Sequence, residues 1–150
     1  MLLGRGDGTF DKEIACGLAL NENASGNALA DFDHDQKIDM VVGTKVFLGM
    51  NGCNFSTSVA TRSGSDVAVA DLNGDGNPDI VTESSTMPGD EQISVLLGDG
   101  HGGFASPLSF PSLGGQPYWN FLVGDLNRDT KLDIIVTRPD GWQVLLNTCP

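Results

Sequence analysis

The sequence predicts an all-β fold made of repeated units of four short antiparallel strands. The chain has 150 residues, enough for one domain with its own core, and is rich in Gly, Val, Ile and Thr. An apolar segment ending in Gly or Asn recurs four times, and an aspartate-rich loop followed by a β-branched run recurs three times. Regular recurrence of strands and loops indicates a repeat architecture.

The apolar segments set the length of the repeat. The first three are each followed by a glycine-rich turn that closes on Phe. The segments occupy residues 1–4, 46–49, 95–98 and 144–147, so the period is about 45–49 residues. This length is typical of one four-stranded blade of a β-propeller.

Each blade is expected to have four strands. The first is small and apolar, which suits the innermost position, where neighbouring blades crowd around an axis. First strands are expected at 27–30, 67–70 and 121–124, and second strands, which leave the aspartate loops, at 39–42, 79–82 and 133–136. The recurring apolar segment is the third strand, and the fourth follows the Phe turn, as in 104–110.

The chain therefore holds about three blade equivalents. We expect a partial blade at 1–20, complete blades at 25–62 and 65–115, and a partial blade at 119–150. Trp142, which opens the last expected strand, is assigned to the core.

The aspartate loops carry the chemistry. We name them loop 1 (31–39), loop 2 (71–79) and loop 3 (125–133). Each has side-chain oxygens at positions one, three, five and nine: Asp31, Asp33, Asp35 and Asp39; Asp71, Asn73, Asp75 and Asp79; Asp125, Asn127, Asp129 and Asp133. Oxygen-only ligands in a flexible loop suit a hard cation, and calcium above all.

Position six should turn sharply with a positive φ, which favours glycine. Only loop 2 has one, Gly76, whereas loop 1 has Gln36 and loop 3 has Thr130. We therefore expect calcium to prefer loop 2, then loop 1, then loop 3. The alternative for loops 1 and 3 is a decayed loop that is held by hydrogen bonds from side chain to backbone, as in Asx turns. An EF-hand is excluded, since it needs Glu at position twelve and flanking helices.

The net charge is −12, and ten of the twenty acidic residues lie in the three loops. Such acidity argues against nucleic acid or an anionic membrane as a partner. No apolar run is long enough for membrane insertion, and residues 1–4 are too short for a signal peptide. Cys16, Cys53 and Cys149 leave the disulfide state open.

Two stretches, ADLNGDGNPDIV (70–81) and VLLGDGHGGF (95–104), resemble the FG-GAP/VCBS repeat family. This family forms the calcium-binding blades of integrin α-subunit propellers and their bacterial relatives. The resemblance implies a β-propeller that is secreted or displayed at the cell surface, with up to three Ca²⁺ per chain. It also implies a main-chain carbonyl ligand at position seven of each loop: Lys37, Asn77 and Lys131.

Three blades are too few to close a ring, because propellers have about four to eight. We expect either a two-fold dimer that exchanges terminal strands into a six-bladed ring, or further blades in a longer parent protein. Arg5, Gly6 and Asp7 spell an integrin-binding tripeptide, but the repeat register places them in the glycine-rich turn.

The expected function is extracellular binding or adhesion, with a carbohydrate or protein ligand and without catalysis. Tyr118 and Trp119 could form a stacking platform for a sugar or peptide, or Trp119 could plug the channel or contact a dimer partner. A propeller-type polysaccharide lyase or hydrolase and a purely architectural spacer are the alternatives. No convergent acid/base pair remains once the loop aspartates are assigned to metal.

Overall fold

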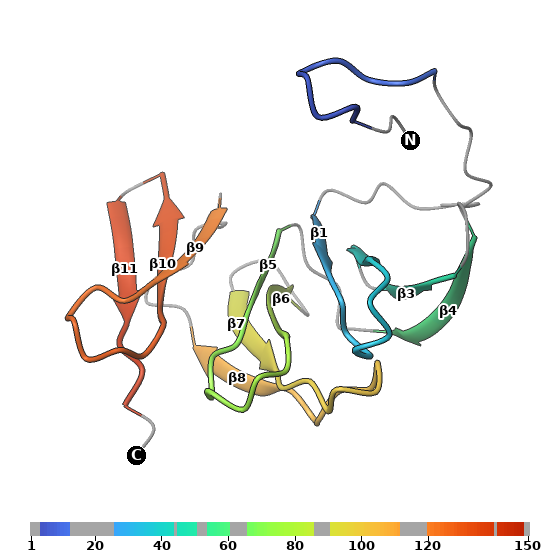
Figure 1. Ribbon diagram of the computed structural model, residues 1–150. Coiled ribbons are helices and arrows are strands. Elements are labelled where there is room, and N and C mark those ends of the chain that lie inside the picture. The colour runs from blue at the N-terminus through green and yellow to red at the C-terminus, as the bar shows by residue number, and fades with distance from the viewer. Residues whose placement is uncertain are drawn as a thin grey trace.

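The computed structural model describes residues 4–12, 26–43, 45–50, 54–60, 66–85, 91–111, 120–139 and 141–148. These residues form eleven β-strands and no helix (Figure 1). A membrane-spanning helix is accordingly absent from the described part of the chain.

The strands form three antiparallel sheets. Sheet 1 has the order β1(Asn27–Ala30), β2(Asp39–Val42), β3(Lys45–Gly49) and β4(Phe55–Ala60). Sheet 2 has the order β5(Val67–Ala70), β6(Asp79–Ser85), β7(Glu91–Leu96) and β8(Leu108–Pro111). Sheet 3 contains β9(Asn120–Gly124), β10(Asp133–Arg138) and β11(Gly141–Leu145), in the order β11-β10-β9. The predicted all-β fold of blade-like antiparallel sheets is confirmed, and over the described residues the sheets do not close into a ring.

The first strands of successive sheets lie next to one another. β1 contacts β5, and β5 contacts β9. Figure 1 shows the three sheets side by side, each with its first strand toward the neighbouring one. This arrangement agrees with the innermost position expected for the strands of small apolar residues.

Two apolar clusters fill the spaces between the sheets. One joins sheets 1 and 2 and includes Val41, Ile80 and Leu96, and the other joins sheets 2 and 3 and includes Val81 and Val95. Neighbouring residues of β6 and β7 thus belong to different clusters, because successive side chains of a strand point to opposite faces. Sheet 2 is buried on both faces, which explains its continuous apolar runs.

Some strand bounds differ from those expected from the sequence. β7 begins earlier than the expected 95–98 and ends at Leu96, and β8 lies later than the start of the expected 104–110. The end of β7 and the late start of β8 follow from the turn between them: Gly98 pairs with Phe104 in an isolated bridge, and the Asp99 amide donates to the Gly103 carbonyl at 3.1 Å.

The described N-terminal residues 4–12 contain a matching turn rather than a strand. Gly4 pairs with Phe10, and the Arg5 amide donates to the Thr9 carbonyl at 3.0 Å. The tripeptide at Arg5 therefore lies in the glycine-rich turn, as the repeat register indicates. The rest of the expected partial blade, residues 1–3 and 13–20, lies outside the described residues.

The assignment of Trp142 to the core is wrong. Its side chain is 72% exposed, because β11 is an outer strand of its sheet and Trp142 lies near the start of that strand. An aromatic residue at the start of a β-strand signals burial only if another layer covers that strand.

Candidate metal centres

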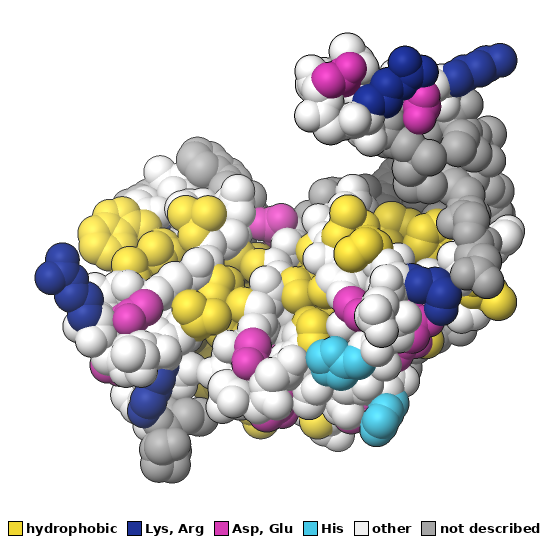
Figure 2. Space-filling view, viewed as in Figure 1, with side chains coloured by type: hydrophobic (Ala, Val, Ile, Leu, Met, Phe, Trp, Pro, Cys, Tyr) yellow, Lys and Arg dark blue, Asp and Glu magenta, His cyan; other side chains and the backbone are white. Residues whose placement is uncertain are grey.

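The three aspartate loops connect the first and second strands of the three sheets, and each begins and ends in the same register. Ala30 pairs with Asp39, Ala70 with Asp79, and Gly124 with Asp133. The residue before each loop is thus opposite position nine. Figure 2 shows acidic side chains over each of the three loops.

All three loops share one backbone conformation. Positions four and six have positive φ in each: His34 (57°) and Gln36 (66°), Gly74 (74°) and Gly76 (88°), Arg128 (64°) and Thr130 (73°). The sharp turn predicted at position six is present, and a second one at position four was not predicted. Four of these six residues are not glycine, although a positive φ disfavours side chains with a Cβ.

The aspartate at position one holds this backbone in place. In loop 2, Asp71 Oδ1 accepts hydrogen bonds from the amides of Gly74 (2.8 Å) and Asp75 (3.1 Å), and its Oδ2 accepts one from Gly76 (2.9 Å). Asp125 accepts the corresponding amides of loop 3 at 2.7, 3.1 and 2.9 Å. Charge-assisted bonds of this kind offset the cost of the left-handed residues.

The aspartate at position nine is fully buried in every loop. Asp79 accepts from the amides of Leu72 (2.8 Å) and Gly98 (2.9 Å), so one carboxylate joins the loop, the second strand and the end of the third-strand segment. Asp39 accepts two corresponding amides at 2.7 Å each. Asp133 does so at 2.9 Å each.

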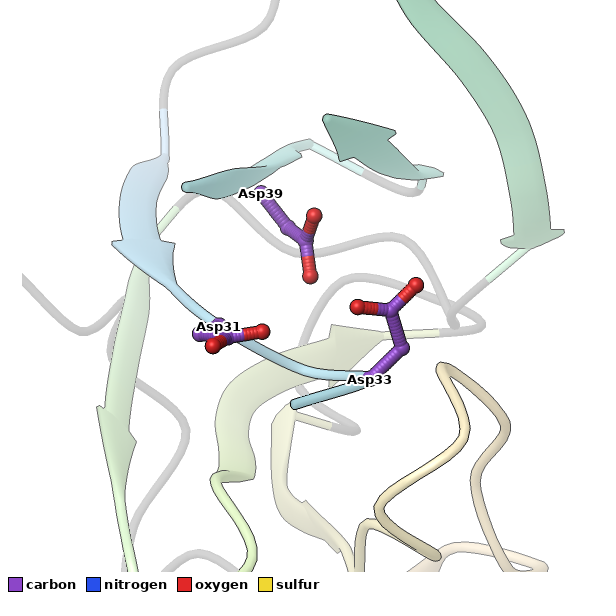
Figure 3. A group of neighbouring side chains, drawn as sticks. All are labelled: Asp31, Asp33 and Asp39. Atoms are coloured by element: carbon purple, nitrogen blue, oxygen red, sulfur yellow. The ribbon is translucent and has the colours of Figure 1, made fainter. Parts of the chain in front are cut away.

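Loop 1 brings carboxylates together most closely. Asp31, Asp33 and Asp39 each place an oxygen within 4.8 Å of the others, and the side chains point toward a common space (Figure 3). Among the described residues this is the only such group of three carboxylate, imidazole or thiol side chains. The donors are all hard oxygens, so the set fits calcium or another hard cation.

The position-five aspartate has a different side-chain partner in loop 1 than in loops 2 and 3. Asp35 forms an ion pair with the Lys37 ammonium, and that side-chain bond lowers the pKa of Asp35 below its ordinary value. In loops 2 and 3 the amide group of the position-three Asn instead donates to the position-five carboxylate: Asn73 to Asp75 at 2.9 Å and Asn127 to Asp129 at 3.0 Å. Sequence spacing alone did not indicate either contact.

At position nine of loops 1 and 2 the pKa of the aspartate is shifted upward, and burial is the main cause. It raises the pKa of Asp39 and of Asp79, and the nearby carboxylates at positions one and three or five add to that rise. A cation among the loop oxygens would favour the ionised form of these desolvated groups. The electrostatics therefore fit a cation-binding loop.

The loops also take part in contacts between neighbouring sheets. His34 Nε2 of loop 1 lies 2.8 Å from Asn77 Oδ1 of loop 2. The Phe32 carbonyl accepts a hydrogen bond from the Gly102 amide at 3.1 Å, and the Leu72 carbonyl accepts one from Asn147 Nδ2 at 2.7 Å. Position two of loops 1 and 2 thus receives a donor from the following sheet, a contact that the sequence pattern did not reveal.

Of the remaining predicted site residues, Tyr118 and Trp119 lie outside the described residues, as do the three cysteines. The position-seven residues Lys37, Asn77 and Lys131 donate their amides to the position-five carboxylates at 2.8 to 2.9 Å. This arrangement fixes the backbone around the carbonyls that the family resemblance implies as ligands.

Residues 63–90 match the model of the FG-GAP repeat. The match spans β5, loop 2 and β6. A search of curated proteins found no match to the chain. The predicted resemblance to the FG-GAP family is thus confirmed over loop 2 and its flanking strands.

Proposed function

We propose that this chain, in which residues 63–90 form an FG-GAP repeat, is a calcium-stabilised β-propeller module for extracellular binding or adhesion. FG-GAP repeats are generally structural rather than catalytic and typically occur in extracellular proteins. The proposed ligand is a carbohydrate or a protein. The chain completes its ring with a second copy or with further blades of a parent protein.

The observation that carries the calcium proposal is the convergence of Asp31, Asp33 and Asp39 in loop 1. The same backbone conformation recurs in loops 2 and 3, and in all three loops the position-one aspartate accepts the amides of positions five and six. A calcium ion would be held by the side chains at positions one, three, five and nine and by the carbonyl at position seven. It would supply positive charge that offsets the repulsion among the carboxylates.

The described geometry favours a clamp rather than a switch. The position-nine carboxylates are buried and already bonded to amides from two segments. Calcium binding would therefore further stabilise a connection between these segments that exists without the ion. At free calcium a hundredfold above the dissociation constant, each loop would add about 2.7 kcal/mol to the free energy of unfolding. Affinities of about 10⁻⁴–10⁻³ M are usual for extracellular calcium modules, which suits a permanent structural ion.

Titration calorimetry of the full chain with calcium, and with magnesium for comparison, tests the metal proposal. We expect saturable calcium binding with up to three sites and weaker magnesium binding, because magnesium demands a stricter octahedral geometry. The double variant Asp31→Asn/Asp33→Asn should remove one site, and Asp11→Asn, outside the loops, should remove none. A titration without calcium heat at millimolar concentration would contradict the proposal.

A glycan array probed with and without chelator tests the binding role. Calcium-dependent retention on particular glycans would support carbohydrate recognition, and loss of that signal in Trp119→Ala would assign it to the predicted platform. Turnover of a polysaccharide would instead support the lyase or hydrolase alternative. Absence of any glycan or protein ligand would leave the architectural role.

A further inference from the structure

An apolar pocket of about 230 Å³ lies between the outer strands of sheets 2 and 3. Leu108 and Phe110 of β8 form one side. Its remaining apolar wall includes Leu72, Val95, Leu97, Ile134 and Leu145. On the side of sheet 3, the wall ends at β11, the outer strand of that sheet in the described chain.

The repeat register identifies the counterpart of this pocket between sheets 1 and 2. The five wall residues align, in order, with Phe32, Val46, Leu48, Ile80 and Leu96. All five counterparts belong to one apolar cluster, and Phe104 packs against the same cluster. Five wall residues of the pocket between sheets 2 and 3 are thus the counterparts of cluster members, but no described residue takes the place of Phe104 there.

Phe104 reaches its cluster at the end of the glycine-rich turn 98–104. Its ring packs edge-on against Phe32, with the ring centroids 5.5 Å apart, and the Gly102 amide donates to the Phe32 carbonyl. A Cβ on Gly102 would lie 2.9 Å from the Leu48 side chain, so the turn fits closely against sheet 1. The described residues that follow β11 offer no such turn to the pocket.

The N-terminal turn 4–10 has the same construction. Its glycines at the two matching positions have φ of 83° and 89°, against 71° and 76° in turn 98–104. Both turns close with the same bridge to a phenylalanine and the same backbone hydrogen bond. Phe10, however, is 62% exposed, and its turn lies across the molecule from β11 (Figure 1).

We propose that the pocket between sheets 2 and 3 receives Phe10 of a second copy of this chain. Phe10 takes the place that Phe104 occupies between sheets 1 and 2, and the turn 4–10 covers the open edge of β11. The Leu72 carbonyl, which accepts one bond from Asn147, has a second lone pair for the Gly8 amide, the counterpart of Gly102. This inference rests on the proposed propeller module and specifies how its ring is completed.

A second copy is favoured because the exchange is reciprocal. In its described residues each copy offers an exposed Phe turn and a pocket for one, so two copies related by a two-fold axis satisfy both at once. A strand edge with no described neighbour, such as the outer edge of β11, invites pairing of this kind.

Sedimentation equilibrium of the full chain in calcium tests the proposal. We expect a dimer, and Phe10→Ala should weaken self-association about a hundredfold or more, because both copies lose an apolar anchor. Phe10→Leu should retain most of the association. Arg5→Ala, which removes a large exposed side chain from the same turn, should leave it unchanged.

A second pair of variants tests the pocket itself. Leu108→Asp places a charge in the wall and should give a monomer, whereas Ser109→Asp, next along β8 and absent from the wall, should still dimerise. A wild-type chain that remains monomeric, or a dimer indifferent to both Phe10→Ala and Leu108→Asp, would overturn the proposal. Calcium titration of the same samples distinguishes the proposed calcium binding from the proposed dimer. A monomer that binds calcium would refute only the docking of Phe10 into a second copy.

Discussion

Loops 2 and 3 reach the same backbone conformation with different residues. Loop 2 has glycine at both left-handed positions, Gly74 and Gly76, whereas loop 3 has Arg128 and Thr130 there with φ values within about 10–15°. In both loops the position-one aspartate accepts the same three amides at nearly the same distances. The comparison teaches that the aspartates impose the conformation and that glycine only makes it less costly.

The largest effect expected is that of calcium on the whole chain. If the three loops bind independently, chelation should lower the free energy of unfolding by about 8 kcal/mol relative to calcium at a hundredfold excess over the dissociation constant. Urea unfolding with calcium and with chelator measures this difference. A loss of about one third that size would mean that only one of the three similar loops takes up the ion.

Removal of a position-nine carboxylate should give the second largest loss in the free energy of unfolding. Asp79→Ala, measured in chelator, should cost about 3–5 kcal/mol, because the amides of Leu72 and Gly98 both lose a charged acceptor. Asp39→Ala should cost about as much, since Asp39 is equally buried and equally bonded. The exposed Asp75→Ala is the control, and a comparable cost there would show that burial is not the cause.

Exchange of the position-six residues tests the comparison of loops directly. Thr130→Gly should stabilise the chain by about 1 kcal/mol, because relief of the left-handed threonine exceeds the added entropy of glycine in the unfolded chain. Gly76→Thr should destabilise it by about 1–2 kcal/mol, entirely through the backbone, since a Cβ on Gly76 would meet no atom within 4 Å. Thermal unfolding of the two variants in chelator measures both, and changes of the same sign would contradict the shared conformation.

The smallest effect expected concerns the ion pair that distinguishes loop 1. Lys37→Ala should raise calcium affinity at loop 1 several-fold, because the Lys37 ammonium occupies Asp35, one of the proposed ligands. The main-chain carbonyl at position 37 is retained. Calorimetry measures the affinity, and Lys12→Ala, distant in sequence from the loops, is the control; equal gains in both variants would indicate a general charge effect instead.

The sequence predicted the structure best close to the aspartate loops. The bounds of β1, β2 and β5 agree with the expected residues, because the fixed register of each loop determines where its two strands begin and end. Farther along each repeat the prediction was less accurate, as for β7 and β8, since the closed turn at Gly98 shortens the pairing. The sequence indicated a glycine-rich turn here, but not that its bridge from Gly98 to Phe104 would separate the two strands by that much.

The convergence of the loop 1 carboxylates was predictable from the sequence, but the surroundings of the loops were not. The spacing of Asp31, Asp33 and Asp39 predicted their convergence in loop 1. The bond between His34 and Asn77 joins residues 43 positions apart, and no local pattern marks either one as a contact between sheets. Such contacts follow from the placement of one sheet against the next, which is set by packing of the apolar clusters.

The buried position-nine carboxylates have a consequence for how the chain folds. Each draws together groups 7 residues away on one side and 10 to 19 on the other, as in Asp39 and Asp79. Such short separations carry a small entropic cost of loop closure, so each hairpin can nucleate by itself before its neighbours assemble. A protein of this type can therefore grow or shrink by whole repeats, as stacked modular arrays do, without a new folding nucleus.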